Sequence, residues 1–393
     1  MEKDQLKYSG DYSKILEGNK IFDKIAYISK YTKIPAYVVG GFVRDGILGV
    51  KSKDIDVTIV GNAKEFATYL RDSIIYDGDK TASLTVYETY GTVQLKTKEY
   101  GEIEFVTARN ESYSRNSRNP ECHPGTLYED LVRRDLTFNA MAISLCGDET
   151  NGMLIDLFGG LNDLKNKIAR TPIDPNQTFS DDPLRMLRTI RFATKYHCTI
   201  DKTTFNGITD NVERIRIIVN ERIHDELTKI LSYSNSYDGI RLLYECGLAN
   251  VIFNISYGLD DYRYQLLYSI MKKIDDFDYT NYGMNYDDIS NIKQDLKWIS
   301  IIAQKDDIKT ELVSKSDFIK RCDAIGHFVT RDAPRQYAIY QLSKDFLSIS
   351  IGKFDNKNTF IKIRETLINS SKYKYNSTYN NKIWTIAFIY YNF

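Results

Sequence analysis

Two patterns of hydrophobic and polar positions divide this chain. Between residues 35 and 150, short β-branched runs alternate with short helical patterns; the runs are AYVVG at 36–40, IDVTIV at 55–60, GTVQLK at 91–96 and EIEFVTA at 102–108. From residue 183 onward, Leu184, Leu187 and Ile190 begin a series of apolar residues at about three-to-four-residue spacing, which predicts helices. The pattern therefore predicts an α+β head followed by all-α domains.

The same patterns suggest where the domains begin and end. We expect an N-terminal helical extension at 1–34, the head at 35–150, a helical neck and body at 151–250, and a helical tail at 251–393. No internal repeat and no long Pro-, Gly- or Ser-rich linker marks these boundaries. A chain of 393 residues is long enough for several domains with separate cores.

Composition limits how the chain could bind a polyanion. Lys plus Arg and Asp plus Glu both number 53, so any affinity for nucleic acid must come from local basic surfaces. The stretch 353–393 is rich in lysine and tyrosine; it could contact RNA phosphates and stack on bases, or it could be an ordinary solvated surface.

Cysteine spacing and hydropathy indicate the compartment. The five cysteines lie far apart without a C-x-x-C pair, which argues against a zinc knuckle, a disulfide framework and a redox motif. The first residues are polar and no apolar run is long enough to cross a bilayer, so we expect neither a signal peptide nor a membrane span. These features predict a cytoplasmic protein.

The candidate chemistry begins at a glycine pair. A predicted buried strand ends at Gly40-Gly41, and a helix is expected to begin near Phe42. Glycine lets a backbone approach a ligand closely, and a helix start offers unpaired N–H groups to an anion. Arg44, one turn into this helix, would add a charged donor. The segment therefore predicts a triphosphate cradle, although a Gly-Gly pair can also be only a turn.

Acidic residues follow on the next predicted strand. Period-two alternation directs the side chains of Asp54 and Asp56 to one face. Mg²⁺ prefers oxygen ligands and takes the rest of them from water and substrate phosphates, so two carboxylates fit a magnesium site; a solvated strand face is the alternative. In a two-metal site, one ion would activate a 3′-hydroxyl and the other would neutralise the leaving pyrophosphate. Glu104 on a later predicted strand could complete this site; its neighbour Glu102 shares the same strand face and could be an ordinary surface acid.

Several motifs in order resemble the class II tRNA nucleotidyltransferases, which include the CCA-adding enzymes, and the bacterial poly(A) polymerases. They are Gly40-Gly41-Phe-Val-Arg44-Asp45 with Asp54-Ile-Asp56, Arg133-Arg134-Asp135-Leu-Thr-Phe-Asn139, Asp156-Leu-Phe-Gly159-Gly160, and Asp181-Asp182-Pro-Leu-Arg185-Met-Leu-Arg188-Thr-Ile-Arg191-Phe. The resemblance covers about residues 35–250. It implies a polymerase-β-like nucleotidyltransferase head followed by helical neck, body and tail domains, with the RNA acceptor end between head and body.

The resemblance also implies roles for individual residues. Gly40, Gly41 and Arg44 would bind the nucleotide's phosphates, Asp54 and Asp56 the metal, and Glu104 would be the third catalytic carboxylate. Arg134 and Asp135 match positions near the nucleotide sugar. A salt bridge at a helix start is the alternative for that pair.

The last motif is expected to select the base. Asp182 should cap a helix, with Pro183 in its first turn, and Arg185, Arg188 and Arg191 follow at three-residue steps. Cytosine and adenine both present an amine beside an unprotonated ring nitrogen. The Asp182 carboxylate could accept from the amine while Arg185 donates to the ring nitrogen, which would admit CTP and ATP and reject UTP and GTP. A capped, charged helix without this role is the alternative.

The resemblance makes Mg²⁺-dependent addition of C, C and A to the tRNA 3′ end the expected function. Poly(A) polymerase, a partial CC- or A-adding enzyme and a silent RNA-binding relative are the alternatives. Segment 111–128 lies where full CCA-adding enzymes carry a loop needed to switch from C to A, which favours all three additions. The oligomeric state is not predicted.

Two residues depart from the family's pattern, and one dipeptide resembles a different site. Asp181 stands where the family has Glu, and Gly46 stands where it has a larger residue. His224-Asp225 resembles the metal-binding pair of a phosphohydrolase, but such a site needs further His and Asp ligands, and the only other histidines are His123, His197 and His327.

Overall fold

The computed structural model describes residues 7–52, 54–87, 91–112, 121–253, 261–279, 286–303, 316, 320 and 336–341. The chain forms two units: unit 1 comprises Met1–Arg185 and His197–Asp210, and unit 2 comprises Met186–Tyr196 and Asn211–Phe393. Within the described ranges, no helix is both long and apolar enough to cross a membrane.

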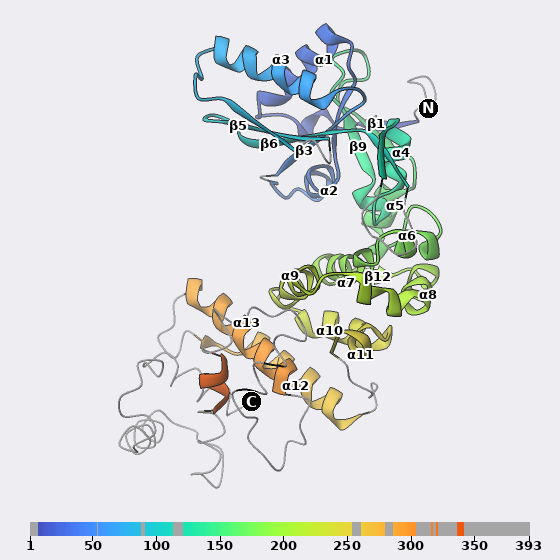
Figure 1. Cartoon of the computed structure of the whole chain (residues 1–393), viewed down its shortest axis with the longest axis vertical. Helices are drawn as coiled ribbons and strands as arrows, with labels where there is room; N and C mark the ends of the chain where they lie inside the picture. The colour runs from blue at the N-terminus through green and yellow to red at the C-terminus, as the bar shows by residue number, and fades with distance from the viewer. Residues whose placement is uncertain are drawn as a thin grey trace. The chain divides into compact units, whose positions relative to one another are not determined.

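Unit 1 is built on an eight-stranded sheet with the order β1-β10-β9-β2-β3-β6-β5-β4 (Figure 1). Neighbouring strands are antiparallel except β3 and β6, which are parallel. The strands are β1 (Tyr8–Asp11), β2 (Ala36–Val39), β3 (Ile55–Ile59), β4 (Ser83–Tyr87), β5 (Thr92–Thr97), β6 (Gly101–Thr107), β9 (Met141–Ser144) and β10 (Met153–Asp156).

Helices cover both faces of this sheet. Figure 1 shows α1 (Ile21–Thr32) and α3 (Ala63–Tyr76) on one face and α2 (Gly41–Ile47) on the other. Lys24 of α1 pairs with Asp77 at the end of α3, and the ring centroids of Tyr31 and Tyr69 lie 6.4 Å apart, so the two helices run antiparallel. The short helix η2 (Ser13–Ile15) packs against α2, and Ile15 there contacts Gly46.

The rest of unit 1 consists of short elements after the central strands. These are the antiparallel pair β7 (Arg109–Ser112) and β8 (Glu121–Pro124), α4 (Leu127–Val132), η4 (Thr137–Asn139), α5 (Gly160–Lys165), β11 (Ile168–Ala169), α6 (Pro175–Asp181), β12 (Thr199–Ile200) and α8 (Lys202–Asn211). Strands β11 and β12 pair in parallel, which joins the returning segment 197–210 to the remainder of the unit.

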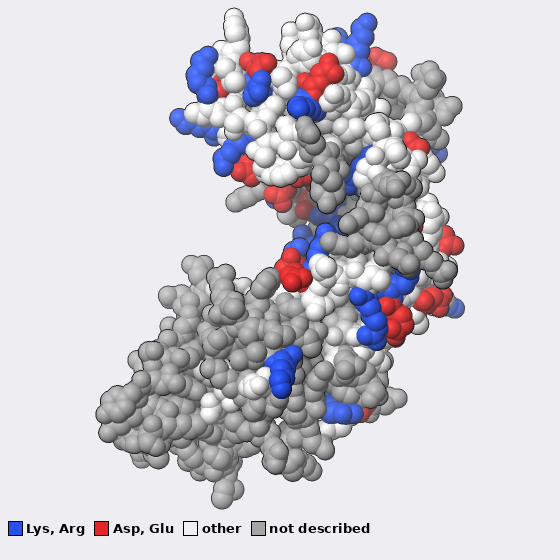
Figure 2. Space-filling view, viewed as in Figure 1, with Lys and Arg blue, Asp and Glu red and all other residues white. Residues whose placement is uncertain are grey.

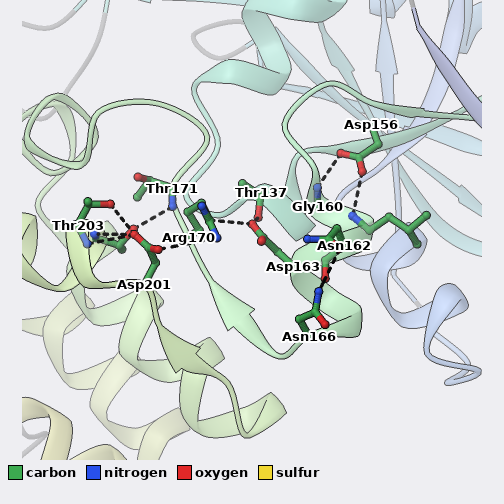
Figure 3. Close-up of polar contacts among 12 residues, drawn as sticks. Thr137, Asp156, Gly160, Asn162, Asp163, Asn166, Arg170, Thr171, Asp201 and Thr203 are labelled. Carbon is green, nitrogen blue, oxygen red and sulfur yellow. Dashed lines mark hydrogen bonds and ion pairs between the residues drawn. The ribbon is translucent and has the colours of Figure 1, made fainter.

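A chain of polar contacts strengthens that junction (Figure 3). Thr137 donates its hydroxyl to Asp163 at 2.8 Å, and Arg170 lies 3.3 Å from Asp163 and 3.8 Å from Asp201. Asp201 in turn accepts from the backbone N–H of Thr203 at 3.1 Å and so caps α8. One buried carboxylate and one arginine therefore tie η4, α5 and α8 together.

The Asp156-Leu-Phe-Gly159-Gly160 motif has a structural role in the same region. The two carboxylate oxygens of Asp156 accept from the N–H groups of Gly160 and Leu161 at 2.8 and 2.9 Å, which satisfies the start of α5 (Figure 3). A Cβ on Gly160 would lie 2.3 Å from the carbonyl oxygen of Thr137. Only glycine allows this close approach.

The described part of unit 2 is helical. It contains the continuation of α7 (Leu184–Tyr196), η5 (Val212–Ile217), α9 (Asn220–Leu231), α10 (Ser236–Glu245), α11 (Leu248–Phe253), α12 (Tyr262–Asp276) and α13 (Tyr286–Ala303). Lys297 of α13 is buried and forms an ion pair with Asp275 of α12 at 2.6 Å. It also donates to the carbonyl oxygens of Leu231 and Tyr233 at 2.8 and 3.2 Å. Lys297 therefore links three helices by capping the end of α9.

The four predicted strands are confirmed, as is the helical pattern after residue 183. The domain boundaries need correction. Residues 1–34 do include a helix, α1, but they are no mere extension, because β1 pairs with β10 in the head sheet. The head also continues beyond residue 150, since β10 to β12 lie within the predicted helical neck. The predictions for 353–393 and for 113–120 of the 111–128 segment lie outside the described residues.

Candidate active site

The glycine turn lies between the buried strand β2 and helix α2. Gly40 has φ 64° and ψ −122°, a backbone conformation that residues with a Cβ rarely adopt, and α2 begins directly after it at Gly41. A Cβ on Gly40 would lie 2.9 Å from Nη1 of Arg134. The turn therefore brings the start of α2 beside a guanidinium group, and the predicted strand-turn-helix is confirmed.

Arg44 is anchored beneath this turn. Its side chain is buried, Nε donates to Asp45 at 2.9 Å, and Nη1 donates to the side-chain oxygen of Asn139. Asn139 donates to Asp135 at 2.8 Å, so one amide joins Arg44 to Asp135. The Nη2 atom of Arg44 would lie 3.6 Å from a Cβ on Gly41, which places this charge at the helix start. These contacts fix the geometry of the cradle, and phosphate binding remains a prediction.

The acidic residues meet on two neighbouring strands. Asp54 directly precedes β3 and Asp56 lies within it; both are exposed, whereas Ile55 and Val57 point into the core. In the parallel register, Asp56 lies opposite Glu104 of β6. The structure thus places the third candidate carboxylate beside the aspartates.

Glu102 lies elsewhere on β6 and has other partners. It accepts from the Gln94 amide at 3.1 Å and pairs with Lys96 at 3.2 Å. Both partners belong to β5, so Glu102 behaves as the surface acid of the two alternatives. Its ion pair is solvent-exposed and contributes little to stability.

The acids repel one another. Desolvation by surrounding atoms raises the pKa of Asp56, the charge of Asp54 raises it further, and Arg134 opposes both effects. Desolvation and the charge of Asp56 likewise raise the pKa of Glu104, against the effect of Arg109. A bound cation would relieve this repulsion.

Asp54 and Asp56 are the residues that fit Mg²⁺, because they offer the hard oxygen ligands that this ion prefers. Across the ranges that the structure describes, no three His, Cys, Asp or Glu side chains lie close enough to form a ready-made metal cluster. A metal held by these two carboxylates would take its further ligands from substrate phosphates and water.

A buried carboxylate that the sequence analysis missed positions the two arginines of the R-R-D motif. Arg134 Nη2 lies 3.0 Å from Oδ2 of Asp130, and Arg133 pairs with Oδ1. Burial acts to raise the pKa of Asp130, but Arg134 and Arg133 outweigh it and hold the pKa below its usual value. Thr58 of β3 also donates to Oδ2, at 3.3 Å.

The R-R-D motif follows the end of α4, so the expectation of a salt bridge at the start of a helix is wrong in its position. The salt-bridge partner is Asp130, at i−3 and i−4 from the two arginines. An acid three and four residues before two arginines, within one helical turn, was the sequence signal that could have revealed these ion pairs.

The start of α7 has the predicted Asp182 cap, although the helix begins at Leu184, one residue after Pro183; base selection stays a prediction. Asp182 follows the end of α6, and its Oδ1 accepts from the N–H of Leu184 at 3.1 Å, so it caps α7. Arg185 is buried and donates to the carbonyl oxygen of Thr178 at 3.4 Å. Both residues belong to unit 1.

Farther along α7, two more arginines belong to unit 2. The guanidinium carbon of Arg191 lies 4.1 Å from the ring centroid of Phe192, and that of Arg188 lies 5.4 Å from it. Arg191 also forms an ion pair with the buried Glu226 at 2.6 Å. These contacts give Arg191 a structural role within unit 2, and nucleotide binding by Arg188 and Arg191 stays a prediction.

Surface charge agrees with the balanced composition. Figure 2 shows Lys and Arg intermingled with Asp and Glu over the visible face of the described residues.

The eight-stranded sheet, the glycine turn and the paired acidic strands define a nucleotidyltransferase head domain. Residues 36–170 match the poly A polymerase head domain, and residues 198–256 match the probable RNA and SrmB-binding site of polymerase A. The chain thus carries a poly A polymerase head domain followed by a segment that matches an RNA-binding region of the same kind of enzyme.

Individual relatives give the same assignment. The chain is 42% identical over 171 residues to the A-adding tRNA nucleotidyltransferase of Aquifex aeolicus, which covers 43% of this chain and 19% of that protein. It is 35% identical over 245 residues to the mitochondrial CCA tRNA nucleotidyltransferase of Saccharomyces cerevisiae, which covers 58% of this chain and 44% of that protein. The chain thus spans less than half the length of these curated relatives.

A solved structure extends the likeness beyond the head. The Thermotoga maritima CCA-adding enzyme complexed with tRNA-CCA has a TM-score of 0.69 and 25% sequence identity to this chain. The match covers 98% of this chain and 83% of that one. The described helices of unit 2 therefore resemble the fold of that enzyme, as the head does.

Proposed function

We propose that this protein is a template-independent RNA nucleotidyltransferase that adds C, C and A to the 3′ end of tRNA from CTP and ATP and releases pyrophosphate. The observation that carries the proposal is the pairing of Asp56 with Glu104 beside the Gly40 turn and Arg134. The relatives that carry tRNA in their names support tRNA as the acceptor.

The residues of the head would divide the work on the nucleotide. Gly40, Gly41 and Arg44 would bind the triphosphate through backbone N–H groups and a charged donor. Asp54 and Asp56 would hold Mg²⁺, which neutralises charge on the phosphates and favours ionisation of the attacking 3′-hydroxyl.

The remaining acid and the R-R-D motif would act beside them. Glu104 would add negative charge on the side where the acceptor hydroxyl loses its proton. Arg134 and Asp135 would orient the sugar, since Arg134 lies against the turn and its charge acts on Asp56.

Base selection would rest on Asp182 and Arg185. Because Oδ1 of Asp182 caps α7, the carboxylate has a fixed orientation, and Oδ2 could accept from the amine of cytosine or adenine. The bond from Arg185 to Thr178 likewise fixes its guanidinium. We expect Arg185→Ala to lose the preference for CTP and ATP over UTP and GTP, or to lose activity. A variant that kept full selectivity in single-nucleotide assays would refute this role.

The decisive experiment offers tRNA ending at the discriminator base with Mg²⁺ and each nucleotide, separately and together, and sizes the product. Three additions that require CTP and ATP would support the proposal. A long adenylate ladder would indicate a poly(A) polymerase instead. A single A, added only to tRNA already ending in CC, would indicate an A-adding enzyme, the second candidate that the Aquifex aeolicus relative favours.

A further inference from the structure

We propose that Asp130 is a positioning residue for nucleotide binding: it holds Arg134 between the Gly40 turn and the acidic strand β3. The inference rests on the proposed function, because Arg134 matters only if a nucleotide binds there. Asp130 is not expected to touch the nucleotide, since its side chain has no exposed surface.

Both oxygens of Asp130 are engaged, and they connect different elements. Oδ1 pairs with Arg133, and Oδ2 accepts from Arg134 at 3.0 Å and from Thr58 at 3.3 Å. Thr58 lies two residues after Asp56 on β3. Asp130 therefore ties α4 to the strand that carries the candidate metal ligand. One carboxylate is thus shared by two guanidinium groups.

The other end of the Arg134 guanidinium reaches the site. Nη2 donates to Asp130, and Nη1 lies 2.9 Å from the position that a Cβ on Gly40 would occupy. One planar group thus spans from the buried carboxylate of Asp130 to the glycine turn.

Asp130 also keeps Arg134 away from the wrong partner. A guanidinium released beside Asp54, Asp56 and Glu104 would pair with one of these exposed carboxylates, because bidentate pairs of this kind are the strong ones. Such a pair would occupy the place of the metal and remove the donor from the turn. The buried carboxylate competes with the acids for Arg134 and thereby leaves them open.

Asp163 provides a matched control in the same unit. It is also buried, accepts from the Thr137 hydroxyl at 2.8 Å and lies 3.3 Å from Arg170 (Figure 3). Each aspartate therefore has one threonine and at least one arginine as partners. The partners of Asp163 join structural elements and carry no predicted role toward the nucleotide.

The test compares Asp130→Asn with Asp163→Asn in the full chain. CTP binding is measured by titration calorimetry with Mg²⁺, kcat and KM are measured with saturating tRNA, and each melting temperature is recorded. We expect both variants to melt earlier, but only Asp130→Asn to weaken CTP binding, by about tenfold or more, the value of a lost charge-assisted hydrogen bond. Equal CTP affinity in the two variants would overturn the inference.

A double-mutant cycle tests whether Asp130 acts through Arg134. In the Arg134→Ala background, Asp130→Asn should weaken CTP binding no further. Additive losses would overturn the inference.

Should Asp130→Asn fail to fold, Thr58→Val and its control Thr137→Val replace the first pair. We then expect weaker CTP binding, by about threefold, in Thr58→Val alone, since one neutral hydrogen bond is lost; equal binding in the pair would refute the idea. Failure of the proposed function shows separately, as a wild-type protein that binds CTP without extending tRNA.

Discussion

Replacing Gly40 by alanine should damage the site in two separable ways. At φ 64° and ψ −122° a residue with a Cβ is strained, which costs about 1–3 kcal/mol of folding stability. The added Cβ would also lie 2.9 Å from Nη1 of Arg134, too close for either atom to stay where it is. Because the guanidinium is the more mobile group, it should move away from the turn. A displacement of about 1 Å at a site of this kind can cost about a hundredfold in rate.

Gly49→Ala is the matched control for this prediction. Gly49 also has a positive φ, 73°, but nothing lies within 4 Å of its would-be Cβ. Both variants should therefore lose stability in urea unfolding, while only Gly40→Ala should raise the KM for CTP, by about tenfold. If Gly40→Ala kept the KM of Gly49→Ala, the position of Arg134 against the turn would not matter for nucleotide binding, and the reasoning would fail.

Three further predictions concern the acids, the N-terminal segment and unit 2. Asp54→Ala and Asp56→Ala should each abolish nucleotide addition with an unchanged circular dichroism spectrum; an active Asp54→Ala protein would refute the metal role. Gly46→Ala should lower the melting temperature, because the added Cβ would lie 2.4 Å from Ile15. Overpacking of this kind costs about 1–3 kcal/mol, more than the roughly 1 kcal/mol of helix propensity that alanine gains over glycine. In a protein that already carries Ile15→Ala, Gly46→Ala should instead raise the melting temperature. Lys297→Met should destabilise unit 2 by about 3–5 kcal/mol in urea unfolding, since it leaves Asp275 buried without its counter-ion, and Asp275→Leu in the same chain should restore part of the loss.

The elements that carry the candidate chemistry were predictable because their signals are local. A β-branched run followed by Gly40-Gly41 specifies a strand and a turn, and alternation along β3 specifies the exposed side of Asp56. The side chain that caps α7 was equally predictable, because Asp182 and Leu184 lie only two residues apart.

The features that were missed depend on contacts between distant parts of the chain. Strands β1 and β10 have four residues each, too few to show an alternation of apolar and polar positions. They are strands because they pair with each other. Asp130 resembles any acid in a helical turn until the fold buries it against Thr58. The choice between Glu102 and Glu104 likewise required the strand register, because both lie on the same face of β6.

The departure at Gly46 also has its explanation in such a distant contact. Ile15 packs where a larger side chain would project from α2, so the bare glycine accommodates the N-terminal segment. A pattern of residues around position 46 could not reveal this neighbour.

The pairing of β1 with β10 has a consequence for the order in which the head is made. β1 is synthesised before the other strands of this sheet, yet its partner β10 follows only after all of them have been made. Until then β1 has no partner strand for its backbone hydrogen bonds. If β1 is displaced when β10 forms, β10 presents a bare edge of N–H and C=O groups to other nascent chains. A bulky fusion placed directly before Tyr8 should therefore cause aggregation during expression rather than loss of catalytic power in the molecules that fold.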